Sequence, residues 1–216
     1  MTLNTYDVII LDCDGVVFDS NLLKINAFES ALSDYDTADI NAFIKYFKNN
    51  FGTSRYHLAR VFIEEFLNQD FNEDLYQKIL KAYGSSCVLL YKESDFTHEF
   101  MKFIQYYKNK KLYIASGGDE NELKEVFREK GIDHYFEKIF GSPRRKDNLV
   151  REVLLENPKK KIIMIGDAKS DFLVSQANVI DFIYMSQHSL VKDTMKKLSR
   201  EHEFKIINNL GALINE

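Results

Sequence analysis

The feature that most constrains the fold is a regular alternation of short apolar runs and amphipathic segments in the second half of the chain. Runs typical of buried strands occur at 111–116, 138–141, 161–166, 180–185 and 204–207. Segments with helical periodicity lie between them, at 120–130, 147–155, 170–177 and 190–200. This alternation is typical of a parallel sheet, because parallel strands need long crossover connections, which are usually helices. We therefore predict an α/β protein with helices on both faces of a parallel sheet.

The first half of the chain has a different pattern. One strand, Val8–Leu11, is followed by a long stretch in which apolar residues recur every three or four positions, with breaks at 34–36, 49–52 and 68–72. Four helices without a strand between them indicate an inserted helical bundle. We predict a core domain formed by 1–20 and 92–216, and an all-helical domain formed by 21–91.

Composition and charge narrow the classes of function. The 29 basic residues are scattered among 33 acidic ones and the net charge is −4, so we expect no nucleic-acid partner. Cys13 and Cys87 match neither a paired metal-ligand spacing nor a disulfide framework, which fits a reducing compartment. No apolar run approaches a membrane span, and the N-terminus lacks the features of a signal peptide. We expect a soluble, cytoplasmic protein with no membrane partner.

Acidic residues stand directly after two of the predicted strands. Asp12 and Asp14 follow the first strand, and Asp167 and Asp171 follow the strand at 161–166. Ligands of parallel α/β sheets bind beyond the carboxyl ends of the strands. If the first strand continues, its two carboxylates leave on the same face, where a divalent cation would offset their repulsion. The all-oxygen ligands favour Mg²⁺, although an isolated D-x-D-G is equally consistent with a polar turn.

Two further segments supply candidates for binding phosphate. Ser116 and Gly117 lie at a predicted strand-to-helix junction, where free amide groups at the start of the helix could hold an anion. Lys146 ends the basic run RRK just before another predicted helix. Alone, the Ser-Gly-Gly segment is more typical of a simple turn, and a short basic run is more typical of solvated surface.

Together these segments resemble the haloacid dehalogenase superfamily, in its phosphatase branch, over essentially the whole chain. Its four motifs occur in order, as DCDGVVFDS, IASGG, GSPRRKDN and GDAKSD. The resemblance, of phosphoglycolate phosphatase-like or β-phosphoglucomutase-like type, implies a Rossmann-like parallel sheet with an inserted helical cap. It also implies hydrolysis of a small phosphorylated metabolite, of sugar phosphate or phosphoglycolate type, through an aspartyl-phosphate intermediate.

The resemblance implies a role for each motif residue. Asp12 would be the nucleophile, and Asp14 the acid that protonates the leaving oxygen and then the base that activates water. Ser116 and Lys146 would hold the phosphoryl oxygens, together with Gly117.

The implied cofactor is Mg²⁺. Its ligands would be Asp12, the backbone carbonyl of Asp14, and Asp167. Asp171 would either bind the metal through water or orient Lys146.

Within the predicted cap, the segment GTSR is loosely similar to the substrate-reading stretch of cap-bearing sugar-phosphate and phosphoglycolate phosphatases. This similarity implies that Arg55 contacts the part of the substrate that is not phosphate. In the other interpretation, Thr53 or Ser54 caps a helix and Arg55 lies on its exposed face.

Several alternative functions stay open to different degrees. A sugar phosphomutase of the same superfamily shares every core residue, whereas a dehalogenase lacks the second aspartate of the first motif. A phosphonate hydrolase needs a cap lysine, for which Lys24, Lys45 and Lys48 are candidates. A non-catalytic binding protein on this fold is expected to lose a motif residue, and a phosphorelay receiver to lack the helical insertion. The sequence predicts no oligomeric state.

Overall fold

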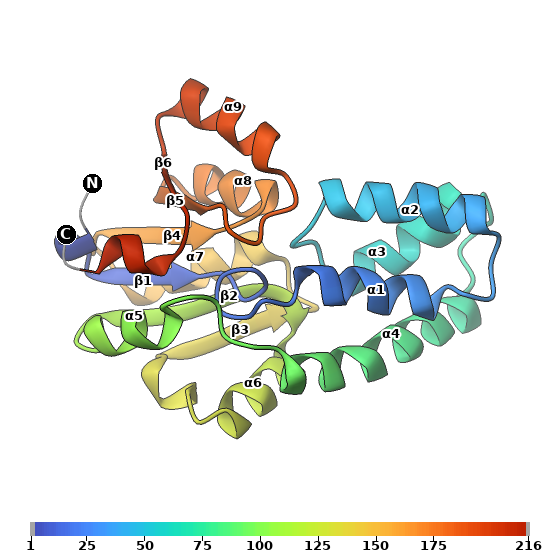
Figure 1. Ribbon diagram of the computed structural model, residues 1–216, viewed down its shortest axis with the longest axis horizontal. Helices are drawn as coiled ribbons and strands as arrows, with labels where there is room; N and C mark the ends of the chain where they lie inside the picture. Colours follow the sequence, from blue (N-terminus) through green and yellow to red (C-terminus); the bar gives the residue numbers. More distant parts are fainter. Residues whose placement is uncertain (1–2, 215–216) are drawn as a thin grey trace.

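A parallel sheet of six strands forms the centre of the protein, in the order β3-β2-β1-β4-β5-β6 (Figure 1). This computed structural model describes residues 3–214. The strands are β1 (Val8–Leu11), β2 (Lys111–Asp119), β3 (Lys138–Ser142), β4 (Ile162–Gly166), β5 (Asp181–Met185) and β6 (Lys205–Ile207). All five neighbouring pairs are parallel. The predicted α/β fold is therefore confirmed, and β1 lies in the middle of the sheet.

Helices cover both faces of this sheet. The helices pack in two separate apolar clusters, one on each face. One cluster includes α5 (Phe100–Tyr106) and α6 (Glu120–Glu129). The other includes α7 (Lys146–Glu156), α8 (Lys169–Ala177) and α9 (Lys192–His202). In β1, Ile9 and Leu11 belong to the first cluster, and Val8 and Ile10 to the second. Buried on both sides, the strand is apolar throughout, as a central parallel strand requires.

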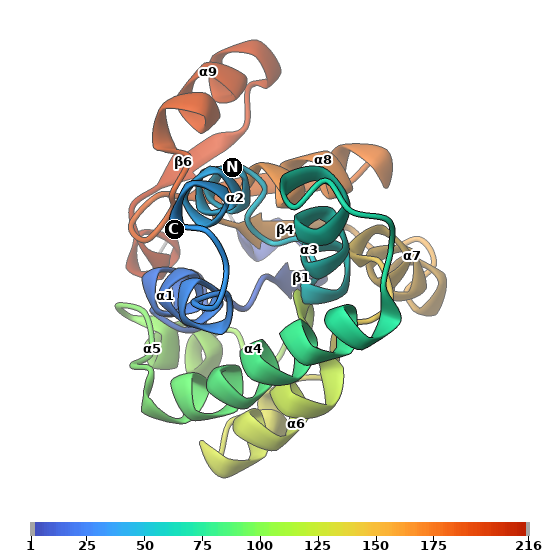
Figure 2. The ribbon, with the colours of Figure 1, turned by 90° about the vertical axis from the view of Figure 1, so that its right-hand side faces the viewer.

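A group of helices between β1 and α5 forms the region that we call the cap. Its elements are α1 (Asn21–Ala31), α2 (Thr37–Asn49), α3 (Arg55–Val61), the π-helical turn η2 (Phe62–Phe66) and α4 (Glu73–Glu93). Figure 2 shows these helices in front of the sheet, at the carboxyl ends of its strands. The interior of the cap is aromatic, with the ring of Phe28 4.2 Å from that of Tyr83 and 5.0 Å from that of Phe43.

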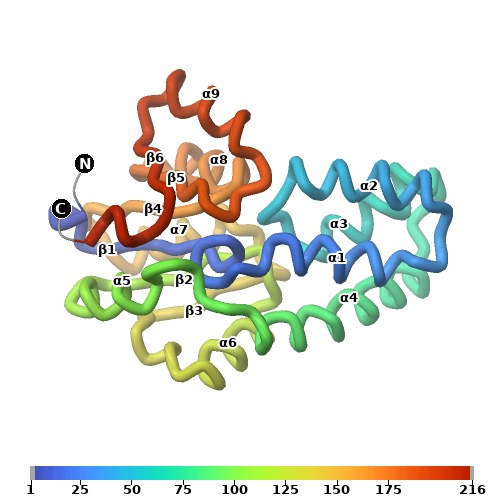
Figure 3. Tube along the Cα trace, in the orientation of Figure 1, coloured from blue at the N-terminus to red at the C-terminus, as the bar shows by residue number. Residues whose placement is uncertain are grey.

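The chain enters and leaves the cap at neighbouring points, as the trace in Figure 3 shows. The amide of Asp19 donates to the carbonyl of Asp95 at 3.0 Å, and Phe18 forms an antiparallel bridge with Phe96. These two segments are the hinge between the cap and the sheet.

The structure differs from the predicted elements in two places that matter for the site. Helix α5 was not predicted, because it begins after Glu99 in a left-handed conformation (φ 65°) with no side-chain cap, so the sequence carries no start signal. Strand β2 runs to Asp119, beyond the predicted end at Ser116. No described helix combines the length and the apolar character needed to cross a bilayer.

Candidate active site

Asp12 stands at the carboxyl end of the central strand. Its amide donates to the carbonyl of Ile165 at 2.9 Å, so the pairing of β1 with β4 continues one residue past Leu11. The side chain is buried. A backbone anchored on the central strand gives this carboxylate a stiff support.

Lys146, the first residue of α7, joins two of the predicted site carboxylates. Its Nζ lies 2.8 Å from Asp12 Oδ1 and 2.7 Å from Asp171 Oδ1. Burial alone would lower the pKa of Lys146, but the two carboxylates raise it above its ordinary value, so the side chain is an ammonium ion. The other oxygen of Asp171 accepts the amide of Ala168 at 3.0 Å. Both oxygens of Asp171 are thus engaged, one of them in orienting Lys146.

Three buried carboxylates, from Asp12, Asp167 and Asp171, place an oxygen each within 4.8 Å of one another. Among the described residues, neither Asp12 Oδ2 nor Asp167 Oδ1 has a hydrogen-bond partner, although both atoms are buried. Burial and the neighbouring negative charges raise the pKa of Asp12 to about 7 and that of Asp167 well above its usual range. Free buried oxygens among repelling carboxylates suit a divalent cation, and the ligand type suits Mg²⁺. The residues present therefore fit the predicted metal.

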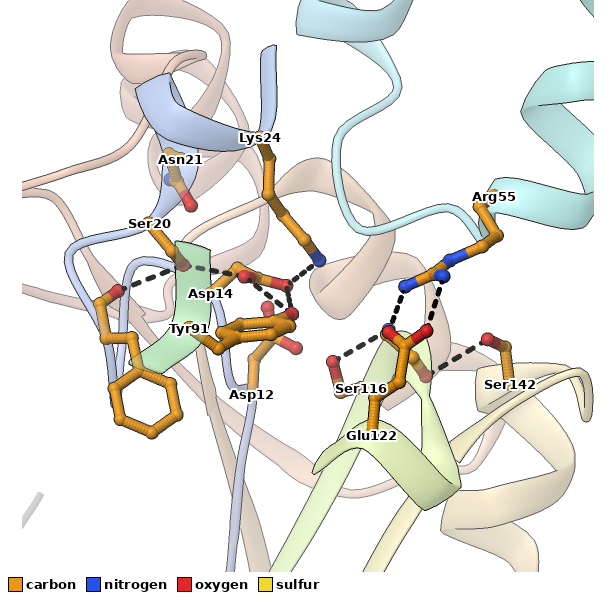
Figure 4. A network of polar contacts seen from close by, with 12 residues as sticks. Asp12, Asp14, Ser20, Asn21, Lys24, Arg55, Tyr91, Ser116, Glu122 and Ser142 are labelled. Atoms are coloured by element: carbon orange, nitrogen blue, oxygen red, sulfur yellow. Dashed lines mark hydrogen bonds and ion pairs between the residues drawn. The ribbon is translucent and has the colours of Figure 1, made fainter. Parts of the chain in front are cut away.

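The carboxylate of Asp14 is bonded to residues at the base of the cap (Figure 4). It accepts hydrogen bonds from Ser20 Oγ at 2.6 Å, from Lys24 Nζ at 2.6 Å, and from the Tyr91 hydroxyl at 3.0 and 3.1 Å. The carboxylates that lie within 4.8 Å of one another are those of Asp12, Asp167 and Asp171, because β1 ends at Leu11 and the backbone turns at Asp14. That the side chains of Asp12 and Asp14 flank one cation stays a prediction. The implied role of the Asp14 backbone carbonyl stays a prediction.

Gly15 makes this turn possible. Its φ is +74°, which residues with a side chain rarely adopt. A Cβ at this position would lie 2.2 Å from Asp167 Oδ2, so any larger residue would collide with the carboxylate cluster. The glycine of the DCDG motif is thus explained by sterics.

Ser116 and Gly117 lie within β2 and not at a strand-to-helix junction. The buried hydroxyl of Ser116 accepts the amide of Gly118 at 3.0 Å. The next helix, α6, begins at Glu120, and Asp119 Oδ1 accepts the amides of Asn121 and Glu122 at 3.0 and 3.1 Å. Asp119 therefore occupies two of the amides at the start of this helix, and the prediction that such amides hold a phosphate stays a prediction.

Arg55 joins the cap to the core. Its guanidinium pairs with both carboxylate oxygens of Glu122 on α6, at 2.8 and 2.5 Å, and only 6% of the residue is exposed. Next to it, the Tyr56 hydroxyl donates to Asp119 Oδ2 at 2.9 Å. The interpretation that placed Arg55 on an exposed helix face is wrong, although Ser54 does cap α3. We call these two contacts the α3–α6 clasp.

The clasp closes a small cavity between the cap and the core. This cavity has a volume of about 10 Å³, and its lining includes Asp14, Lys24, Arg55 and Gly117. Such a volume holds about one water molecule. A larger cleft, of about 440 Å³, lies beside Lys146 and shares Gly117 with the inner cavity. The cap is therefore closed over Asp14.

Sequence reasoning assigned no role to Ser20, Asn21, Tyr91 or Glu122, and it considered Lys24 only for a phosphonate hydrolase. Ser20, Lys24 and Tyr91 bind Asp14, Asn21 binds Asp167, and Glu122 completes the clasp. A signal existed for two of them, because Asn21 and Lys24 are three residues apart in one helix and share a face. Asn21 Nδ2 donates to Asp167 Oδ2 at 2.5 Å. Glu122 had no such signal, since its partner lies far away in the sequence.

Comparison of the chain with known proteins identifies its family. A family model described as haloacid dehalogenase-like hydrolase matches residues 6–174. No curated protein matches the chain.

Similar solved structures span nearly the whole chain. They include a haloacid dehalogenase-like family hydrolase from Streptococcus pneumoniae (19% identity, 97% of this chain and 98% of that one, TM-score 0.67). A hydrolase from Pseudomonas syringae is also similar (16%, 96% and 95%, TM-score 0.77). A third is described as a predicted phosphoglycolate phosphatase from Haemophilus somnus (13%, 95% and 95%, TM-score 0.72). At these identities the structures show a shared fold, and the family model, which covers most of the chain, shows that this protein belongs to the haloacid dehalogenase-like hydrolases.

Proposed function

We propose that the protein is an Mg²⁺-dependent phosphomonoesterase that acts on a small phosphorylated metabolite through an aspartyl-phosphate on Asp12. One observation carries this proposal. Asp12 is buried on the central strand with one oxygen bonded to Lys146 and the other without a partner among the described residues. A buried carboxylate with a free oxygen beside a cation is poised to act as a nucleophile.

In the proposed reaction, Asp12 attacks phosphorus and the bond to the leaving oxygen breaks. Asp14 gives its proton to that oxygen, and later takes a proton from the water that hydrolyses the aspartyl-phosphate. Lys146 and Ser116, with Gly117, stabilise the charge on the phosphoryl oxygens. Two easier steps thereby replace one difficult displacement.

The proposed metal ligands are Asp12, the backbone carbonyl of Asp14, and Asp167. When bound there, Mg²⁺ would neutralise charge on the nucleophile and the phosphoryl group. Asp171 supports the site by orienting Lys146, as their 2.7 Å contact indicates.

The cap supports phosphate-ester hydrolysis better than one of the alternative functions, phosphonate hydrolysis. Of the candidate lysines for a phosphonate hydrolase, Lys45 and Lys48 are exposed on α2, and only Lys24 faces the site. Burial lowers the pKa of Lys24, but the carboxylate of Asp14 outweighs burial and raises it. A lysine held as an ammonium ion is a poor amine nucleophile. A sugar phosphomutase keeps the same core, so an assay for transfer between two sugar positions separates it from a phosphatase.

The test is a panel of phosphorylated metabolites, including sugar phosphates and phosphoglycolate, assayed for phosphate release with and without Mg²⁺. We expect Mg²⁺-dependent release that disappears in Asp12→Asn. If the wild-type chain releases phosphate from no member of the panel nor from p-nitrophenyl phosphate, the proposed function is wrong. The panel also defines the substrate and separates the sugar phosphate type from the phosphoglycolate type.

A further inference from the structure

The general acid of the proposed reaction is held by the cap and not by the sheet. Asp14 lies beyond the end of β1, in a turn that continues through Gly15 at φ +74°. Strand pairing therefore does not fix its carboxylate. The donors that do fix it come from the two chain segments that join the cap to the core, namely the start of α1 and the end of α4 (Figure 4).

Lys24 makes the charged contact with this carboxylate. It belongs to the first turn of α1, only 6% of it is exposed, and its Nζ lies 2.6 Å from Asp14 Oδ2. The same Nζ lies 5.0 Å from the centre of the Tyr91 ring, which gives the ammonium an aromatic neighbour. Tyr91 in turn donates to both oxygens of Asp14. The two cap residues therefore support each other and the acid.

We propose that Lys24 is the positioning residue of the general acid, with Tyr91 as its support, so that the closed cap orients Asp14 for proton transfer. This inference rests on the proposed phosphomonoesterase reaction. An ammonium group has three donors and no acceptor. Nζ donates to Oδ2 while the hydroxyls of Ser20 and Tyr91 donate to Oδ1, so both oxygens of the carboxylate are held in one orientation.

Proton transfer is sensitive to such placement. The acid must come within hydrogen-bond reach of the leaving oxygen, and an error of about 1 Å can slow a reaction by about a hundredfold. Without Lys24, the carboxylate loses its charged anchor and can turn away from the leaving oxygen. The nucleophile and Lys146 are untouched, because they are held from the sheet and from α7.

A pair of substrates with matched shape tests this inference. Benzyl phosphate and p-nitrophenyl phosphate carry one six-membered ring each, but the benzyl alkoxide needs a proton to leave and p-nitrophenolate does not. The parameter to compare is kcat/KM, because it reports phosphoryl transfer to Asp12 and excludes the later hydrolysis of the aspartyl-phosphate.

We expect Lys24→Met to lower kcat/KM for benzyl phosphate by roughly ten- to a hundredfold while p-nitrophenyl phosphate changes by less than about threefold. Tyr91→Phe should also lower kcat/KM for benzyl phosphate relative to that for p-nitrophenyl phosphate, but by a smaller factor. Lys24→Arg, which restores a positive donor, should recover part of the loss. Asp14→Asn should produce the full effect on the benzyl ester.

The matched control is Lys45→Met, which removes an exposed cap lysine and should leave both substrates unchanged. Circular dichroism and the melting temperature show whether each variant is folded. Equal losses of Lys24→Met on the two substrates, or no loss on either, would overturn the positioning role while leaving the phosphatase proposal intact. Absence of Asp12-dependent hydrolysis in the wild-type chain would instead overturn the proposed function and this inference with it.

Discussion

Asp12 and Asp14 are two residues apart in the sequence, yet different regions of the molecule hold their carboxylates. Lys146 and the carboxylates that follow β4 surround Asp12, all from the core. Asp14 is bonded to Ser20, Lys24 and Tyr91 at the base of the cap. In the proposed reaction this arrangement would be a division of labour, in which the core holds the nucleophile and the metal while residues at the base of the cap hold the acid.

The largest loss of activity is expected from a substitution of the nucleophile in the core. Asp12→Asn should lower turnover of any phosphate ester by at least about a thousandfold, because an amide cannot attack phosphorus usefully. The fold should be unchanged, as checked by circular dichroism. Alkyl and aryl phosphates should suffer alike, in contrast to variants on the cap side. Activity within tenfold of the wild type would contradict the assignment of the nucleophile.

Removal of the metal should also act on the core side. We expect EDTA to lower hydrolysis of p-nitrophenyl phosphate by about a hundredfold or more, and Mg²⁺ to restore it. Ca²⁺ should restore it poorly, because its longer and less regular coordination misplaces the nucleophile. Full activity after dialysis against EDTA would show that the carboxylate cluster holds no essential metal.

The α3–α6 clasp tests the cap side. If Arg55 contacts the substrate, as its similarity-based role implies, then Arg55→Ala should lower kcat/KM for the natural substrate by roughly ten- to a hundredfold. Glu122→Gln should then keep or increase kcat/KM, because it frees the guanidinium for the substrate. If Arg55 serves only to close the cap, both variants should lose activity alike. The steady-state comparison of the two variants therefore separates substrate binding from closure.

The smallest expected effect is that of pH and Mg²⁺ on the thermal stability of the protein. Because the folded-state pKa of Asp12, about 7, lies above its ordinary 3.8, the metal-free protein should lose stability as the pH rises between these values. Mg²⁺ binds the deprotonated carboxylates, so it should raise the melting temperature more at pH 8 than at pH 5. At a hundredfold excess over Kd the gain should be about 5 °C or more. A gain that persists in Asp167→Asn would place the cation elsewhere.

The sequence predicted the sheet well because β1 and β4 are continuous apolar runs that end in acidic residues. The convergence of Asp12, Asp167 and Asp171 could be predicted for the same reason, since parallel strands bring their carboxyl ends to one edge. The contacts of the cap could not be predicted in this way. Arg55 and Glu122 form an ion pair only because the whole cap is placed against α6. No residue near either of them in the sequence indicates that they pair. Asp119 differs, because it stands directly before the helix predicted at 120–130, where Asp is a favoured N-cap, so its contact with the amides of α6 could have been predicted.

The hinge has a consequence for how the protein can vary. Asp19 and Asp95 are bonded neighbours, so the chain between them is a closed loop whose ends stay fixed whatever it contains. The entropy of closing a flexible loop grows only logarithmically, by about 0.6 kcal/mol for each doubling of its length. A longer cap therefore costs little in loop-closure entropy, and every described strand lies outside this loop.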